Sequence, residues 1–380
     1  MQGSFRTLYY STHNAYFSNR SEDTIGYGGS ISYTSGAVNG FSFGLSGILL
    51  RGIDRPERNR LIKDIGANQA NIGEAYIKYQ YNQIQITVGN QRMNLPFAGD
   101  WDWRITPVLY QGIHTLYGDK DNFITGARIY RFKPWSEGSF TRKTKYNKRY
   151  DSLSNVHKNT DGMWALGMGK SVEFSHSKLQ GVAWRMVNYD YVKTSYLEGR
   201  MTNNINGKLQ PMIAIQFVRG TSDGKKLLGK VDHKSYGLQL GLKYNTLLAT
   251  LNYDHIKSQH DSYRNGALPT PYAHNTSSSI YFAQPFFTSI QDLGAGNAYS
   301  MDIKGQITEQ LFMGGRYSFM DLTNHHKTPS LNQSEYMLYG IYRFRGSLTG
   351  LSINNAIGVQ VSPYKGREFW QNRLAIEYNF

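Results

Sequence analysis

The chain has 380 residues, no cysteine, and 42 Lys and Arg against 27 Asp and Glu, which gives a formal net charge of +15. The absence of cysteine excludes disulfides, thiolate metal sites and a cysteine nucleophile, and the lack of any run of 18 or more apolar residues excludes a transmembrane helix. A basic chain can bind nucleic acid, but here the basic residues are spread along strand-like segments without a recognition motif, so we predict no nucleic-acid partner.

About eighteen strand-like segments follow one another along the chain, an even number as single-chain bacterial barrels require. Short turns rich in Gly, Asn and Asp alternate with long polar loops, which is the layout of an outer-membrane β-barrel. The expected strands are 4–15, 24–35, 40–52, 71–82, 84–93, 109–118, 123–133, 162–173, 178–190, 194–205, 209–219, 234–245, 247–258, 297–307, 311–321, 334–345, 350–361 and 368–380. The expected long loops are 53–70, 94–108, 134–161, 220–233, 259–296 and 322–333.

Apolar and polar side chains alternate within these segments, as in a strand with lipid on one side and water on the other. In the last segment Leu374, Ile376, Tyr378 and Phe380 share one face. Glycine contributes 39 residues and aromatic residues 14% of the chain, which suits aromatic girdles at two membrane interfaces. A soluble β-sandwich is the alternative, but so many strands would need two sandwiches and no linker is visible.

The pattern therefore predicts an all-β fold, a transmembrane antiparallel β-barrel of about 18 strands that forms one domain over residues 1–380. Long loops would lie on the extracellular side of a Gram-negative outer membrane. No signal peptide is visible after Met1, so we expect a mature sequence.

Several stretches resemble the OprD family of outer-membrane channels, which are substrate-specific, carboxylate-selective porins. The first strand carries Phe5-Arg6-Thr7-Leu8-Tyr9-Tyr10, and the most specific match is Val88-Gly89-Asn90-Gln91, Leu95-Pro96, Asp102-Trp103-Arg104-Ile105-Thr106-Pro107 and Gln111-Gly112. Trp103 stands where the family usually has a small polar residue. The resemblance implies a third and a seventh loop folded into the lumen, a ladder of basic residues along the pore wall, and no cofactor.

Strand parity predicts which cations face the lumen, because a charge on the lipid face near mid-membrane costs about 2–4 kcal/mol. Arg185, for example, lies opposite Val182, Trp184 and Met186, an apolar set that we take as lipid-facing. Arg128 is included although its strand has apolar residues on both faces, and Arg6 is left out for that reason. About half of the members could instead pair with cross-strand acids such as Asp302 or Glu377. The predicted basic ladder is Lys78, Arg128, Arg185, Arg200, Lys243, Lys304, Arg316, Arg343 and Arg373.

The constriction is expected from loops 94–108 and 259–296, the second of which carries a stretch at 280–287 too apolar to extend into water. Arg104 matches the family's third-loop arginine, which the resemblance assigns to the substrate carboxylate, and a guanidinium fork suits that role. Asp102 and Asp292 are candidates for an opposing acidic side that would favour zwitterions. An Asx turn before Gly294 explains Asp292 equally well.

These features predict a channel for passive uptake of small carboxylates such as amino acids or organic and aromatic acids, with no enzymatic activity and no metal. A general anion-preferring porin is one alternative. An outer-membrane hydrolase is another, but the histidines form no triad or metal motif. The expected partners are the lipid and lipopolysaccharide of the outer membrane, the solutes, and the barrel assembly machinery acting on the terminal strand that ends at Phe380. A monomer or a loose trimer is expected.

Overall fold

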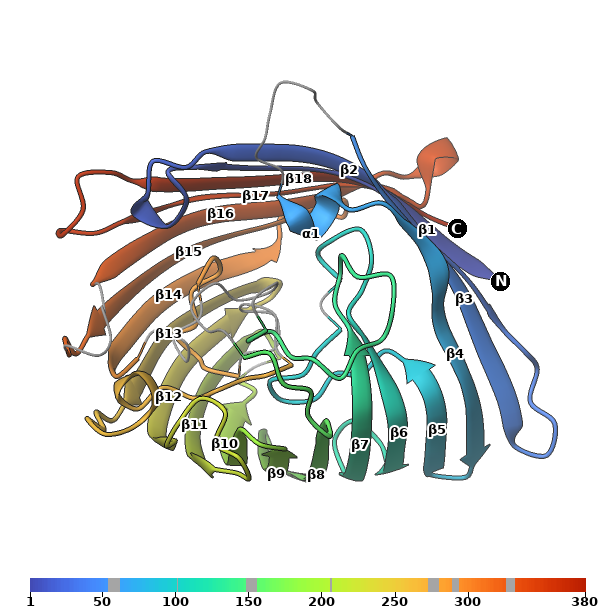
Figure 1. Cartoon of the computed structure of the whole chain (residues 1–380), viewed down its shortest axis with the longest axis horizontal. Coiled ribbons are helices and arrows are strands. Elements are labelled where there is room, and N and C mark those ends of the chain that lie inside the picture. Colours follow the sequence, from blue (N-terminus) through green and yellow to red (C-terminus); the bar gives the residue numbers. More distant parts are fainter. Residues whose placement is uncertain are drawn as a thin grey trace.

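The computed structural model describes residues 1–53, 62–100, 102–147, 156–205, 207–272, 280–288, 294–325 and 332–380. Alternating sequence forms eighteen antiparallel strands, each paired with its neighbours in chain order (Figure 1). They are β1 (Gln2–His13), β2 (Glu22–Thr34), β3 (Phe41–Gly52), β4 (Gln69–Tyr81), β5 (Ile84–Gln91), β6 (Leu109–Gly118), β7 (Phe123–Lys133), β8 (Met163–Phe174), β9 (Ser177–Asn188), β10 (Val192–Asn203), β11 (Leu209–Ser222), β12 (Asp232–Tyr244), β13 (Leu247–Ile256), β14 (Gly296–Gln306), β15 (Leu311–Leu322), β16 (Gln333–Arg343), β17 (Leu351–Val361) and β18 (Phe369–Asn379).

The sheet closes on itself because β1 pairs with β18 as well as with β2. Tyr9 faces Leu374 across the β1–β18 seam, and both backbone bonds between Gly3 and Phe380 complete it. Closure leaves no unpaired strand edge, which a sheet in lipid requires. The predicted fold class is therefore confirmed, with strand bounds that differ from expectation by a few residues.

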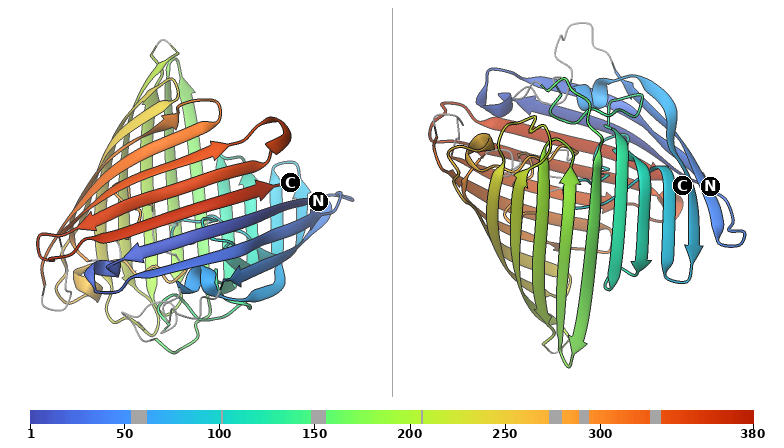
Figure 2. Two further views of the ribbon diagram at one scale, coloured as in Figure 1. Left: turned by 90° about the horizontal axis from the view of Figure 1, so that it is seen from above. Right: turned by 60° about the horizontal axis from the view of Figure 1, so that its bottom comes forward.

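Two rims differ in the length of their connections (Figure 2). At the short-turn rim, strands join through a few residues, as at 82–83, 175–176 and 245–246. At the long-loop rim lie the third loop (92–108) and the seventh loop (257–295), together with the loop that carries the one-turn helix α1 (Lys63–Gly66). In the described residues no helix is long and apolar enough to span a membrane.

One face of most strands carries exposed apolar side chains, and the other is polar or buried. On β12, Tyr236, Leu238 and Leu240 are exposed, whereas His233 and Ser235 between them and the long-loop rim are almost fully buried. The exposed apolar side chains form the outer wall. No other part of the described protein covers them, so they face the lipid. Inward and outward residues can therefore be assigned strand by strand.

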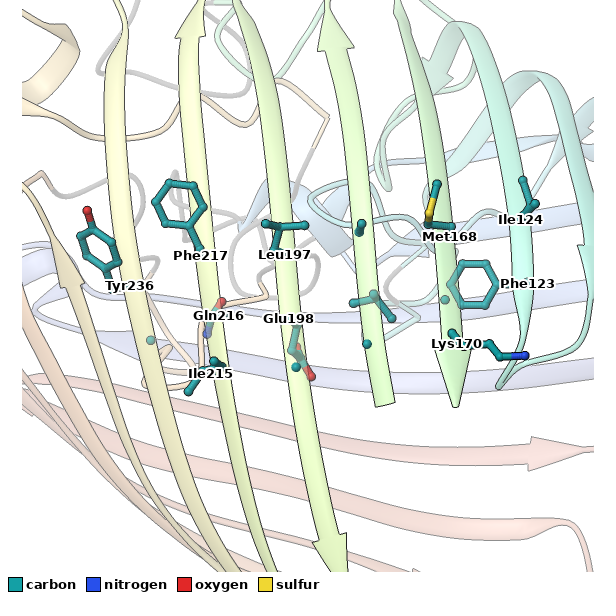
Figure 3. A pocket seen from close by; sticks show the side chains of 16 residues that line it. Phe123, Ile124, Met168, Lys170, Leu197, Glu198, Ile215, Gln216, Phe217 and Tyr236 are labelled. Atoms are coloured by element: carbon teal, nitrogen blue, oxygen red, sulfur yellow. The ribbon is translucent and has the colours of Figure 1, made fainter. Parts of the chain in front are cut away.

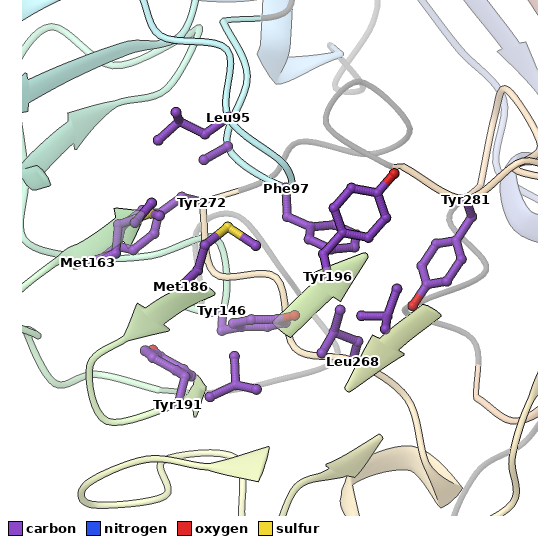
Figure 4. Close-up of a cluster of buried hydrophobic side chains, with 14 of the residues drawn as sticks. Leu95, Phe97, Tyr146, Met163, Met186, Tyr191, Tyr196, Leu268, Tyr272 and Tyr281 are labelled. Atoms are coloured by element: carbon purple, nitrogen blue, oxygen red, sulfur yellow. The ribbon is translucent and has the colours of Figure 1, made fainter. Parts of the chain in front are cut away.

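The inside of the barrel near β7 to β13 is filled by loop residues rather than by water alone. Phe97, Tyr146, Leu268, Tyr272 and Tyr281 come from loops and pack against inward-facing wall residues of one buried apolar cluster (Figure 4). Wall members of this cluster include Met163, Met186 and Tyr196. An apolar face inside this barrel can therefore mean contact with a loop.

Gly28 lets strands β2 and β3 approach closely at one point. Its φ is +151°, a conformation that side chains rarely adopt, and a Cβ there would lie 2.0 Å from the carbonyl oxygen of Leu49. Position 28 therefore requires glycine, and it belongs to the Gly28-Gly29 pair in the second strand.

Candidate pore constriction

Asp102 and Arg104 are neighbours in the third loop but have different surroundings. The Asp102 carboxylate is partly exposed and accepts from two arginines, with Oδ1 3.1 Å from Nη1 of Arg6 and Oδ2 2.9 Å from Nη1 of Arg92. Arg104 is only 1% exposed, and its Nε and Nη2 donate to Oδ2 of Asp64 on α1 at 3.3 and 3.2 Å. The guanidinium of Arg104 is therefore covered in this structure, and the predicted direct contact with a solute cannot form here.

Two guanidinium groups share the ring of Tyr10. The Cζ atoms of Arg104 and Arg373 each lie 4.9 Å from the Tyr10 ring centroid, and Arg104 also lies 4.7 Å from the ring of Trp135. Such cation–π contacts offset the loss of water around a buried cation. The Nη1 atom of Arg104 and the Nε atom of Arg373 are buried without a hydrogen-bond partner. A positive potential is thus concentrated beside the third loop, with Asp64 the carboxylate that contacts Arg104.

Arg6 and Arg92 tie the third loop to the wall. Arg6 on β1 donates from Nη2 to Glu377 of β18 at 2.8 Å and from Nη1 to the Asp102 carbonyl oxygen at 2.8 Å. Its Nη1 also bonds the carbonyl oxygen of Arg104. The Arg92 guanidinium reaches Glu74 on β4 at 3.8 Å. The loop is therefore fixed at the inner wall by side chains that also carry charge into the lumen.

Burial alone would lower the pKa of the Arg92 guanidinium, but the nearby Asp102, with Glu74 and Asp100, outweighs burial and raises this pKa above its usual value. The pKa of Asp100 is raised because burial disfavours its charged form more than Arg92 favours it. Arg92 therefore stays charged at every physiological pH. Its single positive charge cannot by itself neutralise the three carboxyl groups around it, Glu74, Asp100 and Asp102.

The seventh loop is held to the wall by two buried carboxylates. Asp254 on β13 accepts from the backbone N–H of Ala283 at 2.6 Å, and Glu335 on β16 accepts from the N–H groups of Phe286 and Phe287 at 2.6 and 3.0 Å. Gln360 adds a third donor to Glu335 at 2.8 Å. Backbone amides are thereby the partners that make two buried charges tolerable.

Arg316 and His233 complete this attachment. Arg316 on β15 donates to the carbonyl oxygens of Gln284 at 2.7 Å and of Phe282 at 3.2 Å. The His233 ring on β12 lies 2.7 Å from the Gly266 oxygen through Nδ1 and 2.8 Å from the Tyr281 hydroxyl through Nε2. The described part of the seventh loop thus contacts inward-facing residues of at least four strands.

Two aromatic contacts join the described parts of the third and seventh loops. Trp103 meets Phe286 edge to face at a centroid distance of 5.2 Å, and Phe97 lies 5.9 Å from Tyr281. Phe286 also lies 5.4 Å from the Arg373 guanidinium. The aromatic–arginine cluster therefore sits where the two loops meet. Asp292 lies outside the described residues.

Seven members of the predicted ladder are on inward-facing positions of their strands. Three of them are already paired. Arg200 is 3.0 Å from Glu198, while Lys304 and Arg316 are 3.8 and 3.4 Å from Asp302. The other four have no carboxylate partner in the described part of the chain: Lys78, Lys243, Arg343 and Arg373.

Arg185 is on the outer wall, and the prediction that it lines the pore is wrong. Leu179 on the same face of β9 is 46% exposed, whereas Met186 belongs to the buried cluster and Val182 and Trp184 pack against it. The apolar face of β9 is the inward one, and it is excluded from water because loops inside the barrel cover it. Apolarity was therefore misread as contact with lipid.

Arg128 is also on the outer face of its strand. Ile124 on that face is 53% exposed, and Ala127 and Ile129 on the other face lie in the inner cluster. The Arg128 guanidinium lies 4.3 Å from the ring of Tyr130 and 5.0 Å from that of Tyr189. An arginine between aromatic rings near the long-loop rim suits the membrane interface.

Sequence reasoning missed Arg6, Arg92 and Tyr10 as parts of this site. Arg6 alternates with the outward Phe5, which is 47% exposed, but Leu8 and Tyr10 on the inward face concealed this. Those two residues are apolar because the loop bearing α1 and Ile105 cover them. In the described residues no group of His, Asp and Glu side chains is arranged to hold a metal ion.

A closed barrel of eighteen strands with two loops attached inside it defines an outer-membrane porin. The family model described as "outer membrane porin, OprD family" matches residues 3–380, and the chain belongs to this family. It is therefore a channel of the Gram-negative outer membrane rather than an enzyme, as the sequence predicts. No curated protein sequence matches the chain.

Solved structures with the same fold have low sequence identity to this chain. OpdK of Pseudomonas aeruginosa, solved with vanillate, is 12% identical with a TM-score of 0.81, covering 100% of this chain and 97% of that one. OccAB3 of Acinetobacter baumannii is 16% identical with a TM-score of 0.78, covering 100% and 98%. A BenF-like porin from Pseudomonas fluorescens is 14% identical with a TM-score of 0.79, covering 100% and 97%.

Proposed function

We propose that this porin passes small carboxylate-bearing solutes, selected where the third and seventh loops meet. One observation carries the proposal. In the described strands each inward carboxylate has a cationic or N–H partner, as Glu198, Asp302, Glu335 and Glu377 illustrate. Among the residues that the structure describes, four inward cations have no carboxylate partner: Lys78, Lys243, Arg343 and Arg373. The wall therefore carries a surplus of uncompensated positive charge, which raises the local concentration of anions.

Of these four cations, three lie toward the short-turn rim: Lys78, Lys243 and Arg343. Arg373 lies where the third and seventh loops meet. Lys78 is three residues from the end of β4, and Arg343 is the last residue of β16. An anion would pass from the potential of Arg104 and Arg373 to these cations through weak successive contacts, which conduction requires. Arg104 acts in this scheme through its field and by holding the third loop, because its fork is covered.

Aromatic side chains at the loop contact support carboxylates that carry a ring. Phe286 and Phe287 lie beside Arg373, whose guanidinium is 5.6 Å from the Phe287 ring, and Trp103 packs against Phe286. OpdK, a porin of the same fold, was solved with vanillate. The partly exposed Asp102 would also accept the ammonium of an amino acid, so zwitterions remain within the proposed class.

Liposome swelling tests this proposal with benzoate-type acids, amino acids and uncharged sugars of matched size. Wild-type porin should admit the acids several-fold faster than the sugars. Arg104→Ala should reduce acid flux while the barrel keeps its resistance to unfolding in detergent. Equal uptake of sugars and acids would instead indicate a general porin.

Ion selectivity provides a second, independent measurement. The reversal potential in a KCl gradient should show anion preference, and Lys78→Glu with Lys243→Glu and Arg343→Glu should shift it toward cations. All three residues lie near the short-turn ends of their strands, away from the contacts that attach the third and seventh loops. A reversal potential that does not move would remove these residues from the conduction path.

We further propose that the chain folds as one barrel domain, that the terminal strand β18 and Phe380 are recognised by the barrel assembly machinery, and that the porin is a monomer or a loose trimer. The Phe380 ring packs on Tyr378 at 5.8 Å. Deleting Phe380 should lower the amount of assembled protein in the outer membrane, measured by heat-modifiable gel mobility.

A further inference from the structure

Three cations form a row on the outer wall of the barrel, near the long-loop rim. Arg185 on β9 and Arg219 on β11 both pair with Ser195 on β10, and Arg219 pairs with Lys234 on β12. All are on the outward face, because Leu179, Ile215 and Tyr236 on the same faces are exposed. We call Arg185, Arg219 and Lys234 the outer cation row.

This row is unusual for a wall that faces lipid. A cation there costs about 2–4 kcal/mol at mid-membrane but little at the interface. Each member lies two or three residues from the long-loop end of its strand, at Asn188, Ser222 or Asp232. The row therefore marks the level of the lipid head groups.

Two members of the row are available to an anion. In the described residues neither Arg185 nor Lys234 has a carboxylate within ion-pair distance, and Arg185 donates from Nη1 to the Ser195 hydroxyl at 2.6 Å. Arg219 bonds Asp232, and its hydrogen bonds to the Gly220 and His233 oxygens come from the same atom, Nη1. The short Ser195 side chain leaves space between the two arginines, whose backbones are about 10 Å apart.

A recess in the outer wall lies beside this row, and Figure 3 shows the side chains that line it. Its volume is about 970 Å³. The lining includes the small residues Gly181, Ala183 and Gly199 and the larger apolar residues Met168, Leu197 and Phe217. Three residues of the lining, Ala183, Phe217 and Tyr236, are each two residues from a member of the cation row, so the recess begins about 7 Å from the row.

We propose that this face binds a phosphorylated, acylated glycolipid of the outer leaflet, with a phosphate on the outer cation row and an acyl chain in the recess. Charge complementarity favours this occupant. Arginine forks bind phosphate oxygens bidentately, and an acyl chain suits a groove made by small residues between large apolar ones. The arrangement is separate from the pore, so it does not depend on the solute that the channel passes.

Native mass spectrometry of the purified porin in detergent tests the proposal, with hexa-acylated, diphosphorylated lipid A and its dephosphorylated form as probes. Wild-type porin should bind the phosphorylated form at least tenfold more tightly. Arg185→Gln with Arg219→Gln and Lys234→Gln should weaken it by about 100-fold, since each cation near a membrane surface is worth about fivefold. Heat-modifiable gel mobility and single-channel conductance verify that each variant is folded.

Two further variants separate the parts of the site. Gly199→Leu fills the recess without changing charge and should weaken lipid A binding while leaving the phosphate preference intact. Lys208→Gln removes an exposed cation of the turn between β10 and β11 at the short-turn rim, outside the recess, and should leave lipid A binding unchanged.

Three outcomes would overturn the proposal. The dephosphorylated lipid could bind as tightly as the phosphorylated one, or the triple variant could retain lipid A. Alternatively, lipid A could fail to bind while Gly199→Leu converts a trimer into monomers, in which case the face is an interface between copies of this chain.

Discussion

Removal of the Glu335 carboxylate should release part of the seventh loop from the pore wall. Glu335 is 1% exposed and accepts the backbone N–H groups of Phe286 and Phe287 at 2.6 and 3.0 Å. A hydrogen bond to a charged group contributes about 1.5–3 kcal/mol, so the two backbone bonds contribute about 3–6 kcal/mol to docking. In Glu335→Ala the docking equilibrium of this segment should fall by about 10²–10⁴-fold.

Hydrogen exchange measures this change directly. Peptides that cover residues 281–288 should exchange faster in Glu335→Ala than in wild type, while peptides from β14 to β17 should not. Glu335→Gln keeps one acceptor oxygen and should show a smaller increase. Asp254 and Arg316 still hold residues 282–284, so only the following part of the loop should be released. Single-channel recordings should show a larger or noisier conductance, because the released part can move in the pore.

Glu309→Gln is a matched control, since Glu309 is 75% exposed at the short-turn rim and pairs with Arg345. It should change neither exchange nor conductance. If Glu335→Ala folds and the exchange of residues 281–288 stays at the wild-type rate, the two backbone bonds do not hold the seventh loop against the wall.

Three other expectations concern the wall. Arg185→Leu should leave anion selectivity unchanged, in contrast with Lys78→Leu, because only Lys78 faces the lumen; a shifted reversal potential for Arg185→Leu would contradict the outward assignment. Gly28→Ala should destabilise the barrel by about 1–3 kcal/mol, measured by urea unfolding in detergent, whereas Gly47→Ala, with nothing within 4 Å of its Cβ position, should have little effect; equal stabilities would show that the strands can separate at Gly28. Tyr10→Leu should lower carboxylate flux by loosening Arg104 and Arg373, and wild-type flux would exclude a positioning role for the ring.

Charge on a strand can be assigned to the lumen from sequence only where the opposite face meets lipid. This condition holds on β12, β14 and β16, where Lys243, Lys304 and Arg343 alternate with exposed Leu, Ile or Tyr side chains. It fails on β9, where Trp184 and Met186 contact the loop-filled interior. The alternation of a strand indicates that one of its faces is excluded from water. It does not indicate whether that face contacts lipid or packed protein.

The attachment of the loops to the wall could not be predicted either, because the residues in contact are far apart in the sequence. Nothing near Glu335 predicts that its partners are the amides of Phe286 and Phe287, 48 or 49 residues away. A backbone amide has no residue identity, so contacts of this kind leave no trace in composition or periodicity. The same applies to Asp64, which lies 40 residues from the Arg104 side chain that it binds.

The alternation of side chains, the turn chemistry and the third-loop motif were sufficient to determine the barrel, its approximate strand count and its family, because a closed sheet in lipid imposes a period of two on every strand. The tertiary structure decided which dry faces meet lipid, which cations are already paired and where Arg104 points. These depend on loops from distant parts of the chain packing inside the barrel, and local sequence carries no record of that packing.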